Sequence, residues 1–552
     1  MAYAYTLIEV GGIQKYILST RKLKEMIGGS EMIESLKDYC LGTLSELGLK
    51  TVTAPQAGAD WCVVMQQAAG ALRLLFADRT VSERFLHAFG GFMLERCPGL
   101  PLYAATADCE WTSDGLKKAR EDVKERLEAK RGRTTLAPHK LWPFSRMAPL
   151  DGLPAVGTAD KEYVSLPSKA RRSQELIDGA REKLRSGIDT ALREVGDDEG
   201  RSLLPPDTEL TWIDNVEELL KDAPNPRLGR VALIHADGNS MGVLFRNCIE
   251  ANRDEAPEKQ VAEMLALSET VDRCTRQAFR EALCGIVRMD LAGRAPGRFY
   301  TVPARPLVLG GDDVTVLVRA DLAFAFTDLY AAALERAGDG AGIRLSAGAG
   351  MVVMTASYPF SRAFALVEQL TDSAKKLTDS TAGGVARQLA PENGRRPSSM
   401  DYLVLTNDVE QDLDALRDHT ALAADGSRLT GRPFLCGGLV PEKLPAGVTV
   451  LSEFLKDARL VLGSLPASHL RAAAEECRKG RAGAQRAWDK LHENVVLGLG
   501  GRGGSEKLHP ASFERIFPKS FFTDDGEGGF RTLLGDYIEL RHLQLFEKKG
   551  GR

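Results

Sequence analysis

The chain has 552 residues and a formal net charge of −4, and 43% of its residues are hydrophobic. This length predicts about three or four domains with a sizeable core, and the hydrophobic share excludes general disorder. The small net charge gives no whole-chain electrostatic footprint for nucleic acid, although it leaves room for a local basic groove.

Nine cysteines occur without a Cys-x-x-Cys pair, which argues against a zinc ribbon and against a disulfide framework. Free thiols fit a reducing compartment. No apolar run reaches the roughly 18 residues of a membrane span, and the N-terminus lacks the pattern of a signal peptide. The sequence therefore predicts a cytoplasmic protein without a membrane partner.

The N-terminal segment has the pattern of a small α+β domain. Its expected elements are a strand at 4–9, a helical stretch at 13–47, strands at 61–65 and 72–76 joined by 66–71, a helix at 81–97 and a strand at 102–107. The order βαββαβ is that of the split βαβ, ferredoxin-like motif.

A polar segment follows and is predicted to be a mostly helical connector, at residues 113–228. It is broken by a proline- and glycine-rich stretch at 138–157. We expect it to link two α+β domains.

Residues 229–379 repeat the N-terminal order of elements. The expected elements are a strand at 231–236, a helix at 257–284, a hairpin of strands 306–309 and 314–318, a helix at 322–336, a strand at 343–354 and a helix at 359–377. Apolar residues at spacings of three and four give the last helix one apolar face, namely Phe360, Phe364, Val367, Leu370, Ala374 and Leu377. An irregular stretch at 383–399 comes next. After it we expect amphipathic helices, notably at 469–493, and a tail set off by glycine-rich residues 497–504.

The hairpin tip, Gly310-Gly311-Asp312-Asp313, is the most informative motif of the chain. The two glycines allow a tight turn and a close approach of a nucleotide to the backbone. The two adjacent carboxylates are hard oxygen ligands of the kind that Mg²⁺ prefers. The motif therefore predicts a metal and nucleotide site.

A second carboxylate site stands at the end of the preceding strand, at Asp237-Gly238-Asn239. The intervening helix is long enough to cross over and return a strand beside the first. We therefore expect Asp237 to converge with Asp312 and Asp313 as the metal centre of a palm-type nucleotidyl transferase. The backbone N–H groups from Asn239 through Ser240 and Met241 to Gly242 open a helix and suit a triphosphate.

These observations predict an α+β protein with two ferredoxin-like palm domains. The expected domains are a degenerate first palm at 1–112, the helical connector at 113–228, a second palm with the Gly-Gly-Asp-Asp motif at 229–390 and a mainly helical C-terminal domain at 391–552. The first palm has Glu9 in place of Asp237 and Ala57-Gly58-Ala59-Asp60 in place of the motif, which indicates a lost metal centre. An alternative is that the two are unrelated α+β domains.

With these motifs in order, the chain resembles the large subunit of type III CRISPR effector complexes. The stretches that carry the resemblance are 11–17, 22–31, 236–242, 310–313, 346–348, 358–363 and 374–376. That family has two palm domains related to GGDEF diguanylate cyclases, and its active members make cyclic oligoadenylates from ATP. The resemblance covers about residues 1–380, and the order of the motifs makes it specific.

The chain departs from the family pattern at three places. It starts at the first palm and has no His-Asp dipeptide, so we expect no HD nuclease domain and no DNase activity. Residues 144–155 look like the family's zinc ribbon with its cysteines replaced, so no zinc is expected. Asn239 stands where relatives often have a second aspartate, which leaves fewer carboxylates for the metal.

The resemblance implies a role for each candidate residue. Asp237, Asp312 and the Gly238 carbonyl would hold Mg²⁺ or Mn²⁺, and Asp313 would bind a second ion or accept the proton of the attacking 3′-hydroxyl. Ser346, Lys375 and Lys376 would contact the nucleotide, together with Gly310 and Gly311. Two ATP molecules would meet between the palms, with Lys22, Lys24 and Ser30 on the acceptor side. The implied partners are CRISPR effector subunits and guide or target RNA.

Other interpretations stay open from sequence alone. Gly238-Asn239-Ser240-Met241-Gly242 fits the G-x-S-x-G nucleophile elbow of a hydrolase, with Ser240 as nucleophile. The palms are alternatively an inactive scaffold that binds nucleotide, RNA or partner subunits. A third alternative keeps the chemistry and changes the product to a cyclic dinucleotide or a mixed-base ring. His235 is expected to pack inside its strand without a chemical role.

Overall fold

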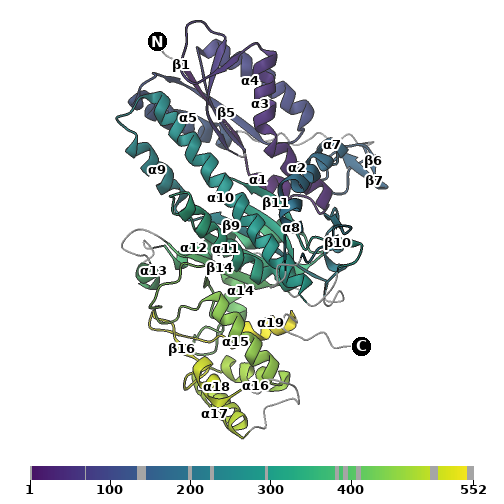
Figure 1. Cartoon of the computed structure of the whole chain (residues 1–552), viewed down its shortest axis with the longest axis vertical. Coiled ribbons are helices and arrows are strands. Elements are labelled where there is room, and N and C mark those ends of the chain that lie inside the picture. The colour runs from purple at the N-terminus through teal and green to yellow at the C-terminus, as the bar shows by residue number, and fades with distance from the viewer. Residues whose placement is uncertain are drawn as a thin grey trace. The chain divides into compact units, whose positions relative to one another are not determined.

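The computed structural model describes residues 3–68, 70–133, 145–196, 202–223, 229–292, 296–379, 384–389, 396–405, 412–497 and 508–543. The chain mixes helices and strands throughout (Figure 1). It forms two compact units, each built from separate stretches of sequence. The first comprises Met1–Thr190, Ser240–Arg276 and Leu307–Asp313, and the second comprises Ala191–Asn239, Gln277–Pro306 and Val314–Arg552.

A five-stranded sheet forms the framework of the first unit, in the order β2-β3-β4-β1-β5. Its strands are β1 (Tyr3–Val10), β2 (Lys50–Val52), β3 (Trp61–Ala68), β4 (Ala71–Phe76) and β5 (Leu102–Cys109). Neighbouring strands pair antiparallel, except for the short parallel pair of β2 and β3. The four strands predicted here are confirmed, and β2 was missed.

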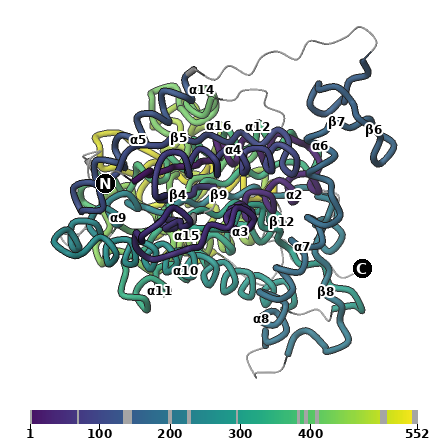
Figure 2. The backbone as a smooth tube through the Cα atoms, turned by 90° about the horizontal axis from the view of Figure 1, so that it is seen from above, coloured from purple at the N-terminus to yellow at the C-terminus, as the bar shows by residue number. Residues whose placement is uncertain are grey.

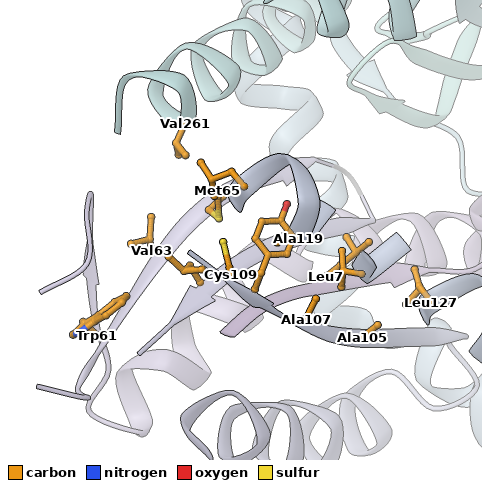
Figure 3. Packing of buried hydrophobic residues seen from close by; sticks show 14 residues of the cluster. Leu7, Trp61, Val63, Met65, Ala105, Ala107, Cys109, Ala119, Leu127 and Val261 are labelled. Carbon is orange, nitrogen blue, oxygen red and sulfur yellow. The ribbon is translucent and has the colours of Figure 1, made fainter. Parts of the chain in front are cut away.

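Helices cover both faces of this sheet because alternate residues of β1 are apolar or small on each side. Tyr5 and Leu7 face α5 (Ser113–Arg133) in a buried cluster that Figure 3 shows. On the opposite face, Thr6 bonds to Ser82 of α4 (Arg79–Arg96) at 2.7 Å.

The helical stretch predicted for residues 13–47 is divided into three helices. They are α1 (Ile13–Ile17), α2 (Leu23–Glu34) and α3 (Leu36–Glu46). The apolar spacing of this stretch does not show where one helix ends and the next begins, because the residues at these breaks also occur inside helices.

The segment predicted as a helical connector also contains strands. It holds β6 (Ala155–Ala159), β7 (Glu162–Ser165), α6 (Leu166–Arg171), α7 (Gln174–Leu184), a π-helical turn (Arg185–Asp189), α8 (Thr190–Arg193), β8 (Glu209–Thr211) and a 3₁₀ turn (Val216–Leu220). The β6–β7 hairpin lies beside α6 (Figure 2). Part of the proline- and glycine-rich stretch, including Phe144, lies outside the described residues.

A six-stranded sheet has the order β11-β12-β9-β13-β14-β15. Its strands are β9 (Arg230–Gly238), β11 (Ala304–Gly310), β12 (Asp313–Arg319), β13 (Ala347–Thr355), β14 (Ser398–Val404) and β15 (Phe434–Cys436). The helices of this region are α9 (Met241–Ala251), α10 (Pro257–Leu291), the 3₁₀ turn Ala320–Leu322, α11 (Ala323–Gly340) and α12 (Phe360–Leu377), and β10 (Phe299–Thr301) pairs with β8. The predicted helix at 257–284 is therefore confirmed and longer, and α9 is a separate helix before it.

Helix α12 packs on β13 through the apolar face that its sequence predicts. Phe360, Phe364, Val367, Leu370 and Ala374 are buried, whereas Leu377 is half-buried. Gly350 of β13 allows this contact, because a Cβ atom there would collide with the backbone of Val367 and Thr371. The sequence of α12 and the glycine of β13 together set how closely the helix approaches the sheet.

The region after α12 is more closely integrated than predicted. The stretch expected to be irregular holds α13 (Gly384–Leu389) and the start of β14, and β14 pairs parallel with β13. Glu335 of α11, which is buried, accepts hydrogen bonds from Ser398 Oγ at 2.6 Å and from the Gly438 N–H at 2.7 Å. The mainly helical C-terminal domain therefore contributes two strands to the second sheet.

The remaining helices form the C-terminal part of the second unit (Figure 1). They are α14 (Leu413–Thr420), α15 (Leu451–Ser464), α16 (Ala467–Arg478), α17 (Arg481–Val496), α18 (Pro510–Ile516) and α19 (Leu534–His542), with a small hairpin of β16 (Thr523–Asp524) and β17 (Phe530–Arg531). The helix predicted at 469–493 is two helices. The final segment docks, since Leu534, Tyr537 and Leu540 are fully buried, while residues 498–504 of the glycine-rich stretch lie outside the described residues.

All nine cysteines are free, as predicted. Across the part of the chain that the structure describes, no helix has the length and apolar character needed to cross a bilayer.

Candidate active site

The predicted hairpin tip forms as expected. Strand β11 ends at Gly310 and β12 begins at Asp313, so Gly311 and Asp312 are the two loop residues. Gly311 has a φ of 63°, a left-handed conformation that favours glycine at the first position of a type II′ turn. The N–H of Gly311 donates to Asp272 Oδ1 of α10 at 2.9 Å. The turn is thus held by a helix as well as by its own strands.

A pocket of about 570 Å³ opens at this tip within the first unit. Its walls come from α1, α2, α3, α10 and the end of β11 with the tip, and its lining residues are Ile13, Ile17, Ser30, Ile33, Glu34, Lys37, Leu265, Ser268, Glu269, Asp272, Arg276 and residues 308–313. The size is in the range of pockets that take small ligands. Asp312 and Asp313 both line it, as does Ser30, which the sequence placed on the acceptor side.

The charge of the pocket is predominantly acidic. Five of its lining residues are acids, namely Glu34, Glu269, Asp272, Asp312 and Asp313, and two are basic, Lys37 and Arg276. Arg276 is already paired with Asp272 at 2.9 Å and with Glu34 at 3.1 Å. A polyanion such as a nucleoside triphosphate would therefore be repelled here unless cations accompany it.

Asp313 has a further contact that the sequence did not predict. Gln14 of α1 donates a hydrogen bond from Nε2 to Asp313 Oδ2. Gln14 belongs to the stretch 11–17 that carried part of the resemblance, and its side chain there was given no role. The contact makes α1 part of the wall around the carboxylates.

At the end of β9, Lys375 of α12 holds two of the predicted metal ligands. Its ammonium group donates to Asp237 Oδ2 and to the Gly238 carbonyl, the latter at 3.3 Å. The side chains of Lys375 and Asp237 remain 27% and 40% exposed, so the pair is accessible to a competing ion. A positively charged group therefore occupies the position where the sequence predicted a cation.

Gly348 of β13 makes the reach of Lys375 possible. It stands opposite Asp237 in the pairing of β9 with β13, and a Cβ atom at this position would collide with Lys375 Cγ. The lysine stem therefore crosses β13 where there is no side chain. This explains why a glycine follows Ser346-Ala347 in the motif.

Asn239 and Ser346 bind each other and are both buried. The Asn239 N–H donates to the Ser346 carbonyl at 2.8 Å, and Asn239 Nδ2 donates to Ser346 Oγ at 3.0 Å and to the Pro397 carbonyl at 3.4 Å. The predicted contact of Asn239 with a triphosphate stays a prediction, and the N–H that would make it is bonded to Ser346 in this structure. An aspartate side chain has no N–H to donate to Pro397, so the asparagine serves a structural purpose here.

Ser240 precedes α9 and has a φ of 57°, which is strained for a residue other than glycine. Helix α9 then starts at Met241, and Gly242 lies in its first turn. Contacts of Ser240, Met241 and Gly242 with a triphosphate stay a prediction.

The remaining predicted residues are distributed as follows. Lys376 and Lys24 are exposed, and Lys22 pairs with Glu162 at 3.1 Å. In the first sheet, Glu9 pairs with Arg131 at 2.7 Å and Asp60 is exposed. His235 is buried and bonded through Nδ1 to Thr315 Oγ1 at 3.0 Å, which confirms its predicted place inside the strand.

Residues 230–382 match the family of the second palm domain of Cas10/Cmr2. The matched segment contains Asp237, the Gly310–Asp313 tip and Lys375, so each of the predicted metal ligands and the principal basic residue lies in the part of the chain that is similar to this palm domain.

Several solved structures align with nearly the whole chain, at TM-scores below 0.5. Csm1 from T. onnurineus has 13% identity and a TM-score of 0.48, with 99% of this chain and 70% of that chain covered. A Csm1-Csm4 cassette in complex with cA3 gives the same four values, and one in complex with one ATP gives 13% identity, a TM-score of 0.47 and coverages of 99% and 70%. No curated protein matches the chain.

The donor atoms of the palm domain fit a hard divalent cation. Asp312 and Asp313 are adjacent carboxylates on a pocket wall, and Lys375 shows that Asp237 and the Gly238 carbonyl together accept a cation. In the described ranges no group of three or more histidine, cysteine, aspartate or glutamate side chains is arranged to hold a metal ion. Mg²⁺ usually takes one or two carboxylates and completes its shell with water and substrate phosphates. The convergence of Asp237 with Asp312 and Asp313 stays a prediction, because Asp237 belongs to the second unit and the other two to the first.

Proposed function

We propose that the chain is a metal-dependent nucleotidyl transferase that makes cyclic oligoadenylates from ATP in a type III CRISPR-type antiviral defence. The observation that carries this proposal is the Gly310–Asp313 tip, two carboxylates on the wall of a pocket of about 570 Å³ at the edge of a Cas10/Cmr2-type palm. The acidic lining supports a requirement for cations, since ATP alone would be repelled.

The fold proposal is that the chain contains two ferredoxin-like palms. The four strands of each βαββαβ segment have the same order in their sheets. Numbered along the chain, the order is second, third, first and fourth, which is β3-β4-β1-β5 in the first sheet and β11-β12-β9-β13 in the second. An internal duplication accounts for this identity of order more simply than two unrelated domains. The proposed domains are 1–112, 113–228, 229–390 and 391–552.

In the proposed reaction, the 3′-hydroxyl of one adenylate attacks the α-phosphorus of an ATP. A P–O bond forms, the bond to pyrophosphate breaks, and the hydroxyl proton passes to Asp313 or to water. Asp237, Asp312 and the Gly238 carbonyl would hold Mg²⁺ or Mn²⁺, which neutralises phosphate charge when bound. Lys375, released from Asp237, would move to the phosphates, and Lys376, Gly310 and Gly311 would contact the nucleotide.

The proposed setting is an intracellular effector complex with other CRISPR subunits and guide or target RNA. No zinc is proposed. Ser30 and Lys37 on the pocket wall are the residues of the first unit that we expect beside the acceptor nucleotide.

The test is incubation of the protein with ATP and Mg²⁺ or Mn²⁺, with and without target RNA, followed by mass spectrometry of the products. Wild type should yield cyclic oligoadenylates. The double variant Asp312→Ala, Asp313→Ala should lose product by at least about 1,000-fold, because it removes the charge that positions metal and nucleotide, while it keeps the wild-type melting temperature. Undiminished product from the double variant contradicts the proposed roles.

An inactive scaffold is the second candidate, and the Lys375–Asp237 pair favours it, because a lysine that permanently fills a metal position would exclude the ion. The same incubation separates the two. A wild type that makes no linear or cyclic product under either condition, and whose melting temperature does not respond to nucleotides, is a scaffold.

A further inference from the structure

We infer that Asp272 of α10 is a positioning residue for the Gly310–Asp313 tip, held in place by a chain of ion pairs that reaches α7. The inference rests on the proposed function, because the tip is the site of the proposed chemistry. Asp272 lies outside every motif that the sequence offered.

Both carboxylate oxygens of Asp272 are used within the protein. Oδ1 accepts the N–H of Gly311 at 2.9 Å, and Oδ2 accepts Arg276 Nε at 2.9 Å. Each oxygen accepts one hydrogen bond from the protein, so the carboxylate is oriented by the turn on one side and by Arg276 on the other. Asp272 therefore acts on the turn, and the turn presents Asp312 and Asp313.

The hydrogen bond between Gly311 and Asp272 fixes the turn at the residue that has the left-handed backbone conformation. Gly311 alone in the tip has a positive φ, and its N–H points to the helix. A charged acceptor makes a stronger hydrogen bond to an N–H than a neutral one does. This bond therefore adds a fixed point to the two-residue loop, beside its strand ends and the contact of Gln14 with Asp313.

Arg276 connects Asp272 to α2. Its second contact is with Glu34, at 3.1 Å, and Lys183 of α7 also reaches Glu34, at 3.5 Å, and Glu31, at 2.6 Å. Burial lowers the pKa of Arg276, but Asp272 and Glu34 outweigh this effect and raise it. The pKa of Lys183 is raised in the same manner, with Glu31 and Glu34 outweighing burial. The pairs therefore favour the charged forms of Arg276 and Lys183.

Helix α10 is a rigid base for this arrangement. Val261 and Leu265 pack in the core of the first unit, where Figure 3 shows Val261 above Met65. Near the start of the same helix, Glu258 accepts Trp111 Nε1 at 2.7 Å. The spacing from Val261 through Leu265 and Ser268 to Asp272 is four, three and four, so these residues share one helix face. This face of α10 packs in the core at Val261 and lines the pocket at Ser268 and Asp272.

The test combines hydrogen exchange of the nucleotide-free protein with steady-state kinetics. In Asp272→Ala, peptides that cover residues 307–313 should exchange their amide hydrogens about tenfold faster, since the hydrogen bond from the Gly311 N–H to a charged acceptor is lost. The kcat for product should fall about 100-fold with little change in the KM for ATP, because misplaced groups act on the reacting geometry. Asp272→Asn keeps an oxygen acceptor for Gly311 and should recover most of the protection and of kcat.

Two further variants control the experiment. Glu263→Ala, an exposed acid on the same helix, should leave exchange and kcat at wild-type values. Arg276→Gln keeps Asp272 and removes the connection to Glu34, and it should give intermediate values even if Asp272→Ala folds poorly.

Wild-type exchange at the tip of Asp272→Ala overturns the inference whatever the activity. Faster exchange with unchanged kcat overturns the positioning role. If wild type makes no product at all, the proposed function is wrong, and the exchange difference alone decides whether Asp272 holds the turn.

Discussion

The ammonium group of Lys375 is a positive charge that the protein itself places at the end of β9. It contacts Asp237 and the Gly238 carbonyl, the two oxygen donors that the sequence assigned to a metal. An ammonium group and a divalent ion cannot share these oxygens, so the two compete. A lysine that is displaced by the ion becomes available to bind phosphate. This fits both predictions from the sequence, a metal site at Asp237 and Gly238 and a nucleotide contact of Lys375.

We therefore expect Lys375→Met to bind Mn²⁺ more tightly than wild type in the absence of nucleotide. Removal of a half-exposed competing ion pair, which contributes up to about 1 kcal/mol, should lower the Kd for Mn²⁺ about three- to fivefold. The affinity for the Mn²⁺–ATP complex should fall, because the phosphates lose a cation. Electron paramagnetic resonance of free Mn²⁺ measures the first effect and isothermal calorimetry the second.

Lys376→Met is the matched control, since Lys376 is exposed and next in sequence. It removes the same charge without a contact to Asp237 and should leave the nucleotide-free Kd for Mn²⁺ unchanged. Weaker Mn²⁺ binding by Lys375→Met than by Lys376→Met would show that the ammonium group does not compete for the site.

At the scale of elements, the sequence predicted well those segments whose pattern is determined locally. The hairpin β11–β12 with its glycine turn and the apolar face of α12 are examples. The breaks between α1, α2 and α3 were missed because apolar spacing continues across them. The strands β14, of seven residues, and β15, of three, were missed, because each is defined by its pairing partner in the sheet rather than by its own sequence pattern.

The contact of α12 with β13 leads to a prediction for Gly350. A Cβ atom at this position would meet the backbone N of Thr371 at 2.7 Å and the Val367 carbonyl, and a backbone cannot rotate away as a side chain can. Gly350→Ala should therefore lower the free energy of unfolding by about 1–3 kcal/mol through overpacking. Urea denaturation followed by circular dichroism measures the change.

Gly463→Ala provides the comparison within the same unit. Gly463 is in a helix and has no atom within 4 Å of a Cβ at its position, so its replacement by alanine should not destabilise the protein and should raise the free energy of unfolding by up to about 1 kcal/mol. Equal stabilities for the two variants would mean that α12 can shift on β13 without cost, and the glycine would then not set the position of Lys375.

At the scale of the whole molecule, the sequence identified the second palm and its candidate carboxylates but not the supports of the site. Asp272 and Gln14 contact the tip, yet neither belongs to a motif with a known role. One signal for Asp272 was available, since it is an acid on the same face of α10 as Val261 and Leu265. Which core that face enters is a tertiary property, and helical periodicity alone does not reveal it.

The C-terminal segment gives the last prediction. Asp536 of α19 is fully buried and accepts hydrogen bonds from the Gly431 N–H at 2.7 Å and from Thr430 Oγ1 at 2.8 Å, and it forms an ion pair with Arg432, whose Nε lies 2.8 Å from Oδ1. Arg432 itself is only 7% exposed and has Glu539 as its other acid partner, at 3.1 Å, so Asp536→Ala would remove one of the two acids beside a buried cation and leave the buried donors of Asp536 without this acceptor. We expect this variant to lose about 3–5 kcal/mol of the free energy of unfolding.

Glu527→Ala, at an exposed acid of the same segment, should be neutral, and Asp536→Asn, which keeps the acceptor for Gly431, should lie between. Denaturant unfolding of the three variants measures this order. Because α19 and β14 share Asp536 through Tyr402, whose hydroxyl lies 3.3 Å from Asp536 Oδ1, the loss should extend to the second sheet. An Asp536→Ala protein whose α19 opens while β14 keeps its wild-type hydrogen exchange would instead make the C-terminal segment an independent attachment to the palm.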